Sequence, residues 1–520
     1  MQGHLQQVIR NPINLFGALC LCILLFFHEA SSVYYYLTIA QLLYIPIVIQ
    51  CVVVMKRWQK VMLCAGQVSV TMLYFTEHQL LSILGATIYF LCTCSIAWSG
   101  IQRFLHRGFI NRAELMIDIG FVYIVMGGLW FFAHIVEIHT GFSPMITWLT
   151  AIHFHYSACL LCITVGLLGR IKMNRLYTFS AAVIALGPLM VAVGITFSRI
   201  IEIIAVTFYV VAIFSLTYFV CTTAFNRVAI QCIRLAFLTL CFTIIWSFLY
   251  AYSNLTNSDL VDIPSMLDFH GILNCFLFGG AITIAWATAV PPSKQLPFTF
   301  PKSKLRHKVE KPFTPHSALV DDMSIFIYKE PLPERIYRFY EETNRFELQA
   351  SVKWASWFKP FAFLYQFIGH KMQQLNLPYP SKAMKMEGDL LQIDEAIDGR
   401  LQPRVWHRKV GSETIFYAIY ATHKTDERAY MNIALPLPYS VMHGILTVRQ
   451  QDQKLLLTSD DVGDAGTYLS FSAFRFRLPL HEYFTLWEEK KQLYAIHHMK
   501  IFGLRFLTIQ YEIREVEHPE

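Results

Sequence analysis

The chain is 520 residues long, and 55% of its residues are hydrophobic and 15% aromatic. Its mean hydropathy is +0.42, a balance that is rare in soluble domains and typical of proteins embedded in a membrane. The net charge of +7 is spread over both parts of the chain, which excludes the concentrated basic surface of a nucleic-acid-binding protein. We therefore expect an integral membrane protein with no nucleic-acid partner.

Charge divides the chain into two parts. Residues 1–290 contain 13 Lys and Arg and 9 Asp and Glu, whereas residues 291–520 contain 30 and 27. All 12 cysteines lie in the first part, mostly within apolar runs, where thiols serve as small packing residues. This pattern predicts a transmembrane helical domain at 1–290, a Pro- and Lys-rich linker at 291–323 and a soluble, cytoplasmic α+β domain at 324–520.

Ten apolar runs in the first part have about the length of a transmembrane helix. A span needs about 20 apolar residues, with about 17 to 25 as the usual range. The runs lie at 12–28, 34–55, 61–76, 79–99, 115–136, 146–169, 176–197, 200–222, 233–253 and 267–290. We therefore predict an all-α polytopic domain of about ten transmembrane helices, in which the third run is the shortest.

The basic residues between these runs predict the topology. With a cytoplasmic N-terminus, 12 of the 13 basic residues of this part fall at cytoplasmic ends, and Arg199 alone lies on the other side. Cytoplasmic loops collect Lys and Arg because positive charge resists translocation. An even number of spans returns the chain to the same side. We expect a multi-pass protein of the plasma membrane with both termini in the cytoplasm.

Other ionisable residues gather at the opposite, extracytoplasmic ends of the runs. An ionisable group in the hydrocarbon region costs a few kcal/mol, usually faces the bundle interior and marks a site. We therefore predict a polar chamber that opens outward. We assign catalytic roles to His153, His155, Glu202, Asp268 and His270, and binding roles to His134, Glu137, Arg199 and Asn274.

Two of these histidines, His153 and His155, lie within the apolar stretch "LTAIHFHYSACLLCITVGLL". Residues at i and i+2 of a regular helix point about 200° apart, so the two rings cannot bind one metal ion together. Either the helix is distorted here, or one ring faces the chamber while the other bonds to a neighbouring helix. We favour the second arrangement; the sequence leaves open which ring faces inward.

Other candidate residues share a helix face. These pairs are His134 with Glu137 and Arg199 with Glu202 at i,i+3, and His270 with Asn274 at i,i+4. In the first pair the carboxylate is placed to orient the imidazole, and in the second the charges are placed to form a buried ion pair. A histidine beside carboxylates serves as general acid or base, proton relay or metal ligand, so a divalent metal is a possible cofactor.

The segments "LTAIHFHYSA", "SRIIEIIAVTFY" and "MLDFHGILN" resemble the YndJ-like family of bacterial membrane proteins. The resemblance covers most of residues 1–290 and implies a polytopic N-terminal region followed by a soluble C-terminal region. It implies no reaction. It draws attention to Thr150, His153, His155, Glu202, Asp268, His270 and Asn274. The chain departs from the family with "YSACL" after the histidines, where Ala-Gly-Phe is more usual, which leaves the shape of a pocket open.

The C-terminal part begins with predicted helices at 332–346 and 349–375, and from residue 383 onward its pattern favours strands. Runs such as "ETIFYAIYATH" and "LRFLTIQYEIR" alternate in polarity and are separated by turn-forming residues. We expect a mainly antiparallel sheet or partial barrel with a helix, whose cavity often holds an apolar ligand. His497 and His498 are adjacent and should point to opposite faces of a strand, so they should not bind a metal together.

Three functions remain open. The first is a membrane-embedded enzyme that acts on a lipid-like substrate through the outer His/Asp/Glu cluster, and we rank it first because histidines are dense on one side. The second is a proton- or cation-coupled transporter, although the sequence shows no clear internal repeat. The third is a sensor whose cytoplasmic sheet domain binds an apolar ligand. The expected partners are membrane lipid and a lipophilic small molecule.

Overall fold

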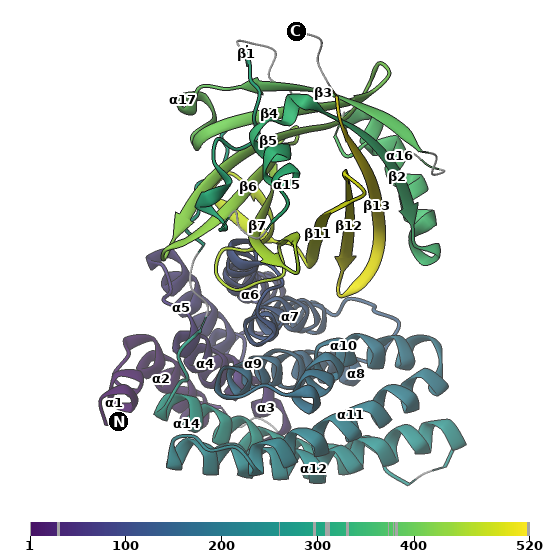
Figure 1. Cartoon of the computed structure of the whole chain (residues 1–520). Helices are drawn as coiled ribbons and strands as arrows, with labels where there is room; N and C mark the ends of the chain where they lie inside the picture. Colours follow the sequence, from purple (N-terminus) through teal and green to yellow (C-terminus); the bar gives the residue numbers. More distant parts are fainter. Residues whose placement is uncertain are drawn as a thin grey trace. The chain divides into compact units, whose positions relative to one another are not determined.

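A computed structural model describes residues 2–28, 32–258, 260–294, 298–306, 313–328, 332–372, 374–377, 379 and 383–516. The chain forms two compact units. Met1–Phe104 and Asn111–Gln295 form the first, which is helical and is called the helical unit below. Leu105–Ile110 and Leu296–Glu520 form the second, which is built on a sheet and is called the barrel unit (Figure 1).

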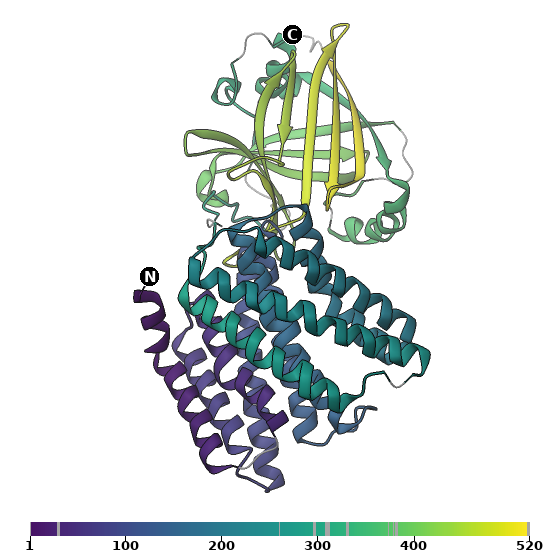
Figure 2. The ribbon, with the colours of Figure 1, turned by 90° about the horizontal axis from the view of Figure 1, so that it is seen from below.

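The helical unit is a bundle whose helices run side by side (Figure 2). Its elements are α1 (Gln2–Ile9), α2 (Pro12–Phe27), η1 (Ser32–Tyr34), α3 (Tyr35–Ile39), η2 (Ala40–Tyr44), α4 (Ile45–Val52), α5 (Arg57–Met72), α6 (Gln79–Arg107), α7 (Arg112–Ile135), α8 (Pro144–His153), η3 (Phe154–Leu160), α9 (Leu161–Ile171), α10 (Arg175–Phe197), α11 (Arg199–Cys221), α12 (Arg227–Thr256), α13 (Ile263–Ser265), η4 (Met266–Gly271), η5 (Asn274–Gly280) and α14 (Ala281–Thr288).

Within the described residues, 8 helical stretches are long and apolar enough to cross a membrane. They are Tyr35–Val52, Gln79–Arg107, Arg112–Ile135, Pro144–Ile171, Arg175–Phe197, Arg199–Cys221, Arg227–Thr256 and Ile263–Thr288. The predicted number of about ten is not confirmed. The first and third runs do form helices, but α2 and α5 have 16 residues each, and α5 carries buried polar side chains such as Gln59 and Gln67.

Asparagine residues fix where several helices begin. Their side-chain oxygens accept hydrogen bonds from the first backbone N–H groups of the helix, which otherwise lack partners. The capping residues are Asn11 before α2, Asn111 before α7, Asn174 before α10 and Asn226 before α12. A proline in the first turn of α2 and α8 also favours these starts. Local sequence therefore favours the positions where these helices begin.

A buried ionic cluster joins helices α6, α7 and α9. Glu114, 1% exposed, receives hydrogen bonds from Arg170 at 2.7 and 2.9 Å and from Arg103 at 2.5 Å. Arg103 also donates to Asp118 at 2.8 Å, and the Ser293 hydroxyl donates to Glu114 at 2.7 Å. Buried charges are tolerated when they are paired and hydrogen-bonded. These acidic residues are therefore part of the scaffold.

Besides η2 in Tyr35–Val52, π-helical turns interrupt the two long stretches that contain His153, His155 and His270. One is η3, which follows His153 and contains His155, and the others are η4 and η5, which contain Asp268, His270 and Asn274. A π turn bonds residue i to i+5 and is found frequently at functional sites. The helix is therefore distorted between His153 and His155, because η3 begins at Phe154.

The barrel unit contains one 13-stranded sheet among the described residues. Its strands are β1 (Thr314–Pro315), β2 (Phe346–Trp354), β3 (Met384–Gln392), β4 (Leu401–Val410), β5 (Glu413–Thr425), β6 (Arg428–Pro436), β7 (Val441–Gln451), β8 (Lys454–Thr458), β9 (Gly466–Phe471), β10 (Phe474–Arg477), β11 (Leu480–Glu489), β12 (Gln492–Ile501) and β13 (Leu504–Glu515). Its helices are η6 (Met323–Ile325), α15 (Glu334–Glu341), η7 (Thr343–Arg345), η8 (Ser356–Phe358), α16 (Lys359–Met372) and α17 (Glu395–Asp398).

The strands close into an antiparallel barrel. The order is β7-β6-β5-β4-β3-β2-β13-β12-β11-β8, and β8 pairs with β7 to complete the ring. Tight hairpins connect several neighbours, and both central residues have positive φ at Asp426–Glu427 and Lys490–Lys491, as hairpin turns that match strand twist require. The predicted antiparallel sheet is confirmed, and it is a closed barrel rather than an open sheet.

One predicted helix is partly a strand. The helix expected at 349–375 begins only at Lys359 in α16, and the preceding residues 346–354 form β2. Along β2 the side chains of Phe346, Leu348, Ala350 and Val352 are buried, a period of two that belongs to a strand. The aromatic residues that follow in the sequence obscured this short alternation.

Residues 298–306 pack against the outside of the barrel, although they belong to the predicted linker. Phe300 is fully buried and lies 4.7 Å from the Tyr468 ring. The Asn432 side chain donates to the Pro301 carbonyl at 2.8 Å, and the Ser303 hydroxyl donates to Asp398 at 2.5 Å. We call residues 298–306 the strap. It is fixed by specific contacts along its length.

Candidate functional site

The helical unit encloses a cavity of about 260 Å³, which we call the helical cavity. It lies between the stretches α8–η3, α11, α12 and η4–η5, so two of its walls contain π turns. Most of its lining is apolar. The candidate residues that line it are His153, Glu202, His270 and Asn274, together with Thr150.

His153 and His155 have different surroundings. His153 is exposed to the helical cavity, and its Nδ1 donates to the Leu149 carbonyl at 2.7 Å. His155 is fully buried, with Nδ1 donating to the Ala151 carbonyl at 2.7 Å and Nε2 bonded to the Tyr89 hydroxyl of α6 at 2.7 Å. The structure therefore places one ring at the cavity and bonds the other to a neighbouring helix, which gives His155 a scaffold role.

His270 has the same arrangement as His153. Its Nδ1 donates to the Thr243 carbonyl of α12 at 3.1 Å, and the Thr243 hydroxyl donates to Asn274 at 3.0 Å. Because a carbonyl oxygen only accepts, Nδ1 carries the proton in both histidines and Nε2 keeps its lone pair. Within the described residues, neither Nε2 has a hydrogen-bond partner. Both imidazoles are thus available as bases.

The predicted ion pair between Arg199 and Glu202 is not formed. Glu202 lines the helical cavity and accepts from Asn254 at 3.3 Å. Arg199 is exposed and donates to the Asn254 carbonyl at 2.6 Å and to the side chain of Asn257, which caps α12 in a left-handed conformation. The C-terminal end of a helix attracts positive charge. The Arg199 guanidinium therefore binds the end of α12 instead of pairing with Glu202, as the i,i+3 spacing had predicted.

The remaining candidates do not join the helical cavity. Asp268 is exposed on η4 outside the lining. His134 bonds to the Pro144 carbonyl at 3.2 Å, and Glu137 lies exposed beyond the end of α7 with φ 58°. The structure therefore does not show the orienting contact expected between these two. In the part of the chain that is described, no group of three His, Cys, Asp or Glu side chains is arranged to hold a metal ion.

The barrel unit encloses a larger cavity of about 450 Å³, which we call the barrel cavity. Aliphatic and aromatic side chains from most strands of the ring line it, and Phe339, Tyr340 and Tyr365 of α15 and α16 contribute to its wall. The polar side chains in the lining are Arg408, Glu482, His497 and four tyrosines, namely Tyr340, Tyr365, Tyr420 and Tyr511. The sequence predicted an apolar cavity here without identifying these residues.

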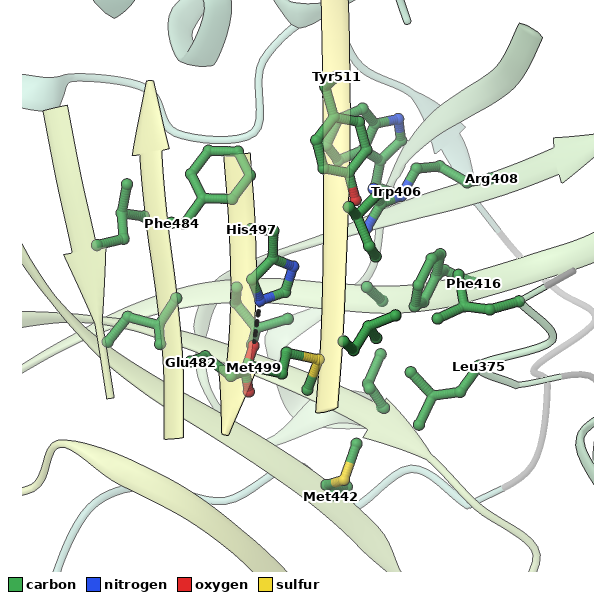
Figure 3. A pocket seen from close by; sticks show the side chains of 18 of the residues that line it. Leu375, Trp406, Arg408, Phe416, Met442, Glu482, Phe484, His497, Met499 and Tyr511 are labelled. Carbon is green, nitrogen blue, oxygen red and sulfur yellow. Dashed lines mark ion pairs between the residues drawn. The ribbon is translucent and has the colours of Figure 1, made fainter. Parts of the chain in front are cut away.

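Two of the polar residues form a cross-strand pair. Glu482 of β11 and His497 of β12 lie 3.3 Å apart, between Oε2 and Nε2, and both point into the barrel cavity (Figure 3). His498 points to the opposite face, as predicted, and bonds to the Thr508 hydroxyl at 3.0 Å. Burial, together with the positive charge of Arg505, lowers the pKa of His498. The two adjacent histidines therefore serve different faces of the sheet.

Arg408 lies at another part of the same cavity. Its guanidinium carbon is 4.5 Å from the centre of the Trp406 ring and 4.6 Å from that of Phe416, and Figure 3 shows Tyr511 beside them. Burial raises the pKa of the Tyr511 phenol, and the positive charge of Arg408 opposes this rise. The strand alternation "PRVWHRKV" contains the signal for this residue, because Arg408 follows the inward-facing Trp406 by two positions.

Comparisons with known proteins bear on the helical unit most directly. Residues 35–278 match the family described as YndJ-like protein, a range that contains every candidate residue of the helical unit. The protein named "Uncharacterized membrane protein YndJ" from Bacillus subtilis (strain 168) is 34% identical over 459 residues, which cover 84% of this chain and 84% of the relative. No solved structure matches the chain.

Proposed function

This chain belongs to the YndJ-like family of membrane proteins, as its histidine-containing segments predicted, and we propose that it binds a lipophilic molecule inside its C-terminal barrel. The observation that carries the proposal is a closed barrel around an apolar cavity of about 450 Å³. Small-molecule sites are typically cavities of about 300–1,000 Å³ with a mainly apolar lining and a few polar groups. The barrel cavity has this size and this composition.

The attachment to a membrane supports the same function. A protein held at a lipid surface has direct access to poorly soluble molecules, and the partners that we propose are a membrane lipid or a lipophilic small molecule derived from it. The helical unit then supplies the anchor, and the barrel supplies the ligand site of a sensor or carrier.

Photolabelling of the full-length chain in lipid nanodiscs tests the proposal. A long-chain alcohol that carries a photoreactive diazirine should label peptides from the barrel lining, identified by mass spectrometry. Ala418 lines the barrel cavity and pairs with Trp406 on the adjacent strand, so Ala418→Phe should fill space and remove the barrel label. Val462→Trp adds bulk at an exposed position and should leave it unchanged. Labelling confined to the transmembrane helices in all three proteins would refute the proposal.

A second candidate function rests on the helical cavity. His153 and His270 line it together with Glu202 and Asn274, and both rings present an unpartnered Nε2. This arrangement supports general acid–base chemistry on a lipid-like substrate, and a proton relay is the alternative. Purified protein should convert a component of a total lipid extract, and His153→Ala and His270→Ala should abolish the conversion. Proton flux through liposomes without lipid conversion would favour the relay.

The topology that we propose places the protein in the plasma membrane with both termini cytoplasmic. The distribution of Lys and Arg supports it, because 12 of the 13 basic residues in 1–290 lie at the ends assigned to the cytoplasm. It requires α2 and α5 to cross the membrane as short spans. A fluorescent protein fused to the C-terminus should fluoresce, whereas alkaline phosphatase at the same place should be inactive; the reverse pattern would contradict the topology.

A further inference from the structure

Arg408 brings a permanent positive charge into an apolar cavity. Its guanidinium lies over the Trp406 and Phe416 rings, at 4.5 and 4.6 Å from their centres, and its buried Nε has no hydrogen-bond partner within the described residues. A guanidinium keeps its positive charge in proteins. Aromatic faces stabilise the cation in part, but a buried charge is costly until an opposite charge joins it.

The other polar groups around Arg408 are the Tyr420 and Tyr511 phenols, and the Tyr511 oxygen accepts a hydrogen bond from Arg408. Burial raises the pKa of the Tyr420 and Tyr511 phenols, and Arg408 opposes the rise in both. Both hydroxyls therefore carry their protons at neutral pH. A guanidinium and neutral phenols facing one cavity favour an acceptor with negative charge.

The carboxylate of the cavity lining does not supply that charge. Glu482 lies 3.3 Å from His497 and accepts from the Thr467 hydroxyl at 3.4 Å. No ion pair joins Arg408 to Glu482 or to another carboxylate among the described residues. The lining thus contains Glu482 beside His497 and, apart from this pair, the Arg408 guanidinium.

We infer that the barrel binds a long-chain amphiphile with a small anionic head, whose head pairs with Arg408 while its alkyl chain fills the apolar cavity. This inference rests on the proposed function and names the ligand class of the same site. The planar guanidinium fork fits a carboxylate or a phosphate monoester, because both present paired acceptor oxygens. Aliphatic residues such as Leu446, Leu457 and Ile509 provide the wall for the chain.

Competition against the photoreactive alcohol tests the charge preference in the full-length chain in nanodiscs. The competitors share one chain length and differ in the head: hexadecanoic acid, hexadecyl phosphate, hexadecanol and hexadecylamine. Hydrogen bonds to charged groups predict that an anionic competitor displaces the barrel label at a concentration at least about tenfold lower than hexadecanol does. The acid and the phosphate arms identify which anion fits better.

Substitutions separate the charge effect from a general loss of folding. Arg408→Met should abolish the tenfold advantage and leave displacement by hexadecanol unchanged, which also shows that the cavity is intact. Arg449→Met removes an exposed arginine of β7 and should retain the advantage. Equal displacement by acid and alcohol, or preferential displacement by hexadecylamine, would overturn the anion inference while the proposed function stands. Failure of every competitor and of the label itself would overturn the proposed function.

Discussion

Replacement of Arg400 by Met should destabilise the barrel unit strongly. Arg400 and Asp398 are both fully buried, with Nε and Oδ2 2.6 Å apart. The guanidinium also donates to the Asn432 carbonyl at 2.8 Å, to the Asn432 side chain at 3.0 Å and to the Ile419 carbonyl at 3.2 Å. The pair thus connects the start of β4 to β5 and β6, and Asp398 in turn holds the strap through Ser303.

The expected loss is about 3–5 kcal/mol, because removal of one partner leaves a buried charge uncompensated. For a domain of about 150–250 residues, each kcal/mol lowers the melting temperature by about 2–4 °C, so the barrel transition should fall by about 6–20 °C. Lys385→Met removes a half-exposed partner of Glu347 in the same sheet, and its effect should be small because solvent screens an exposed ion pair.

Hydrogen exchange of the full-length chain, followed in peptides from β4, β5 and β6 as temperature rises, measures this transition separately from the helical unit. Asp398→Asn combined with Arg400→Met should recover part of the loss, since no buried charge remains unpaired. If Arg400→Met lowers the barrel transition no further than Lys385→Met does, the buried pair does not hold the strands and the reasoning is wrong.

Further outcomes follow from other buried groups. Burial, together with Arg400, Arg306, Arg475 and Lys302, holds the pKa of His443 well below its usual value of 6.5. Below about pH 6.5 the imidazole of His443 is protonated in the unfolded chain but not in the folded barrel, so its contribution to the free energy of unfolding should be constant above that pH and fall by about 1.4 kcal/mol per pH unit below it. Melting curves of His443→Gln between pH 5 and 7.5 should lack this part of the slope. An unchanged slope would show that His443 is not responsible. In the helical unit, His155→Leu removes the hydrogen bond between the ring and the Tyr89 hydroxyl and should cost about 1–3 kcal/mol, whereas addition of Tyr89→Phe should restore part of it. His153→Leu should change stability little, because that ring is exposed to the helical cavity. Thermal melting in detergent compares His155→Leu, its combination with Tyr89→Phe, and His153→Leu. Equal losses of stability for the two single histidine variants would contradict their different roles.

The sequence predicted the positions of the long helices better than the contacts between the candidate residues. Apolar runs located each long helix, because transmembrane length and polarity are strong local signals. The pairing of candidate residues was less predictable. His153 and His270 lie at one cavity, but Arg199 turns to the end of α12, and α8 continues into a π turn that regular helical geometry did not include. Such contacts depend on neighbouring helices that are distant in the chain.

The barrel site shows a different limit. Alternating strands and turn residues predicted an antiparallel sheet, yet closure depends on the pairing of β2 with β13 and of β8 with β11, which no local pattern reveals. The alternation in "PRVWHRKV" places Arg408 on the same strand face as Trp406, but only the closed barrel shows that this face lines a cavity. Its significance therefore comes from the enclosure formed by strands distant in sequence.

A cryo-EM map of the full-length protein, purified from its host without added lipid and resolved well enough to show side chains, tests the central claim most directly. We predict elongated density within the barrel cavity, in contact with the apolar lining and with its head beside the Arg408 guanidinium. A barrel interior filled by water, or closed by rearranged side chains of its own lining, would contradict the account.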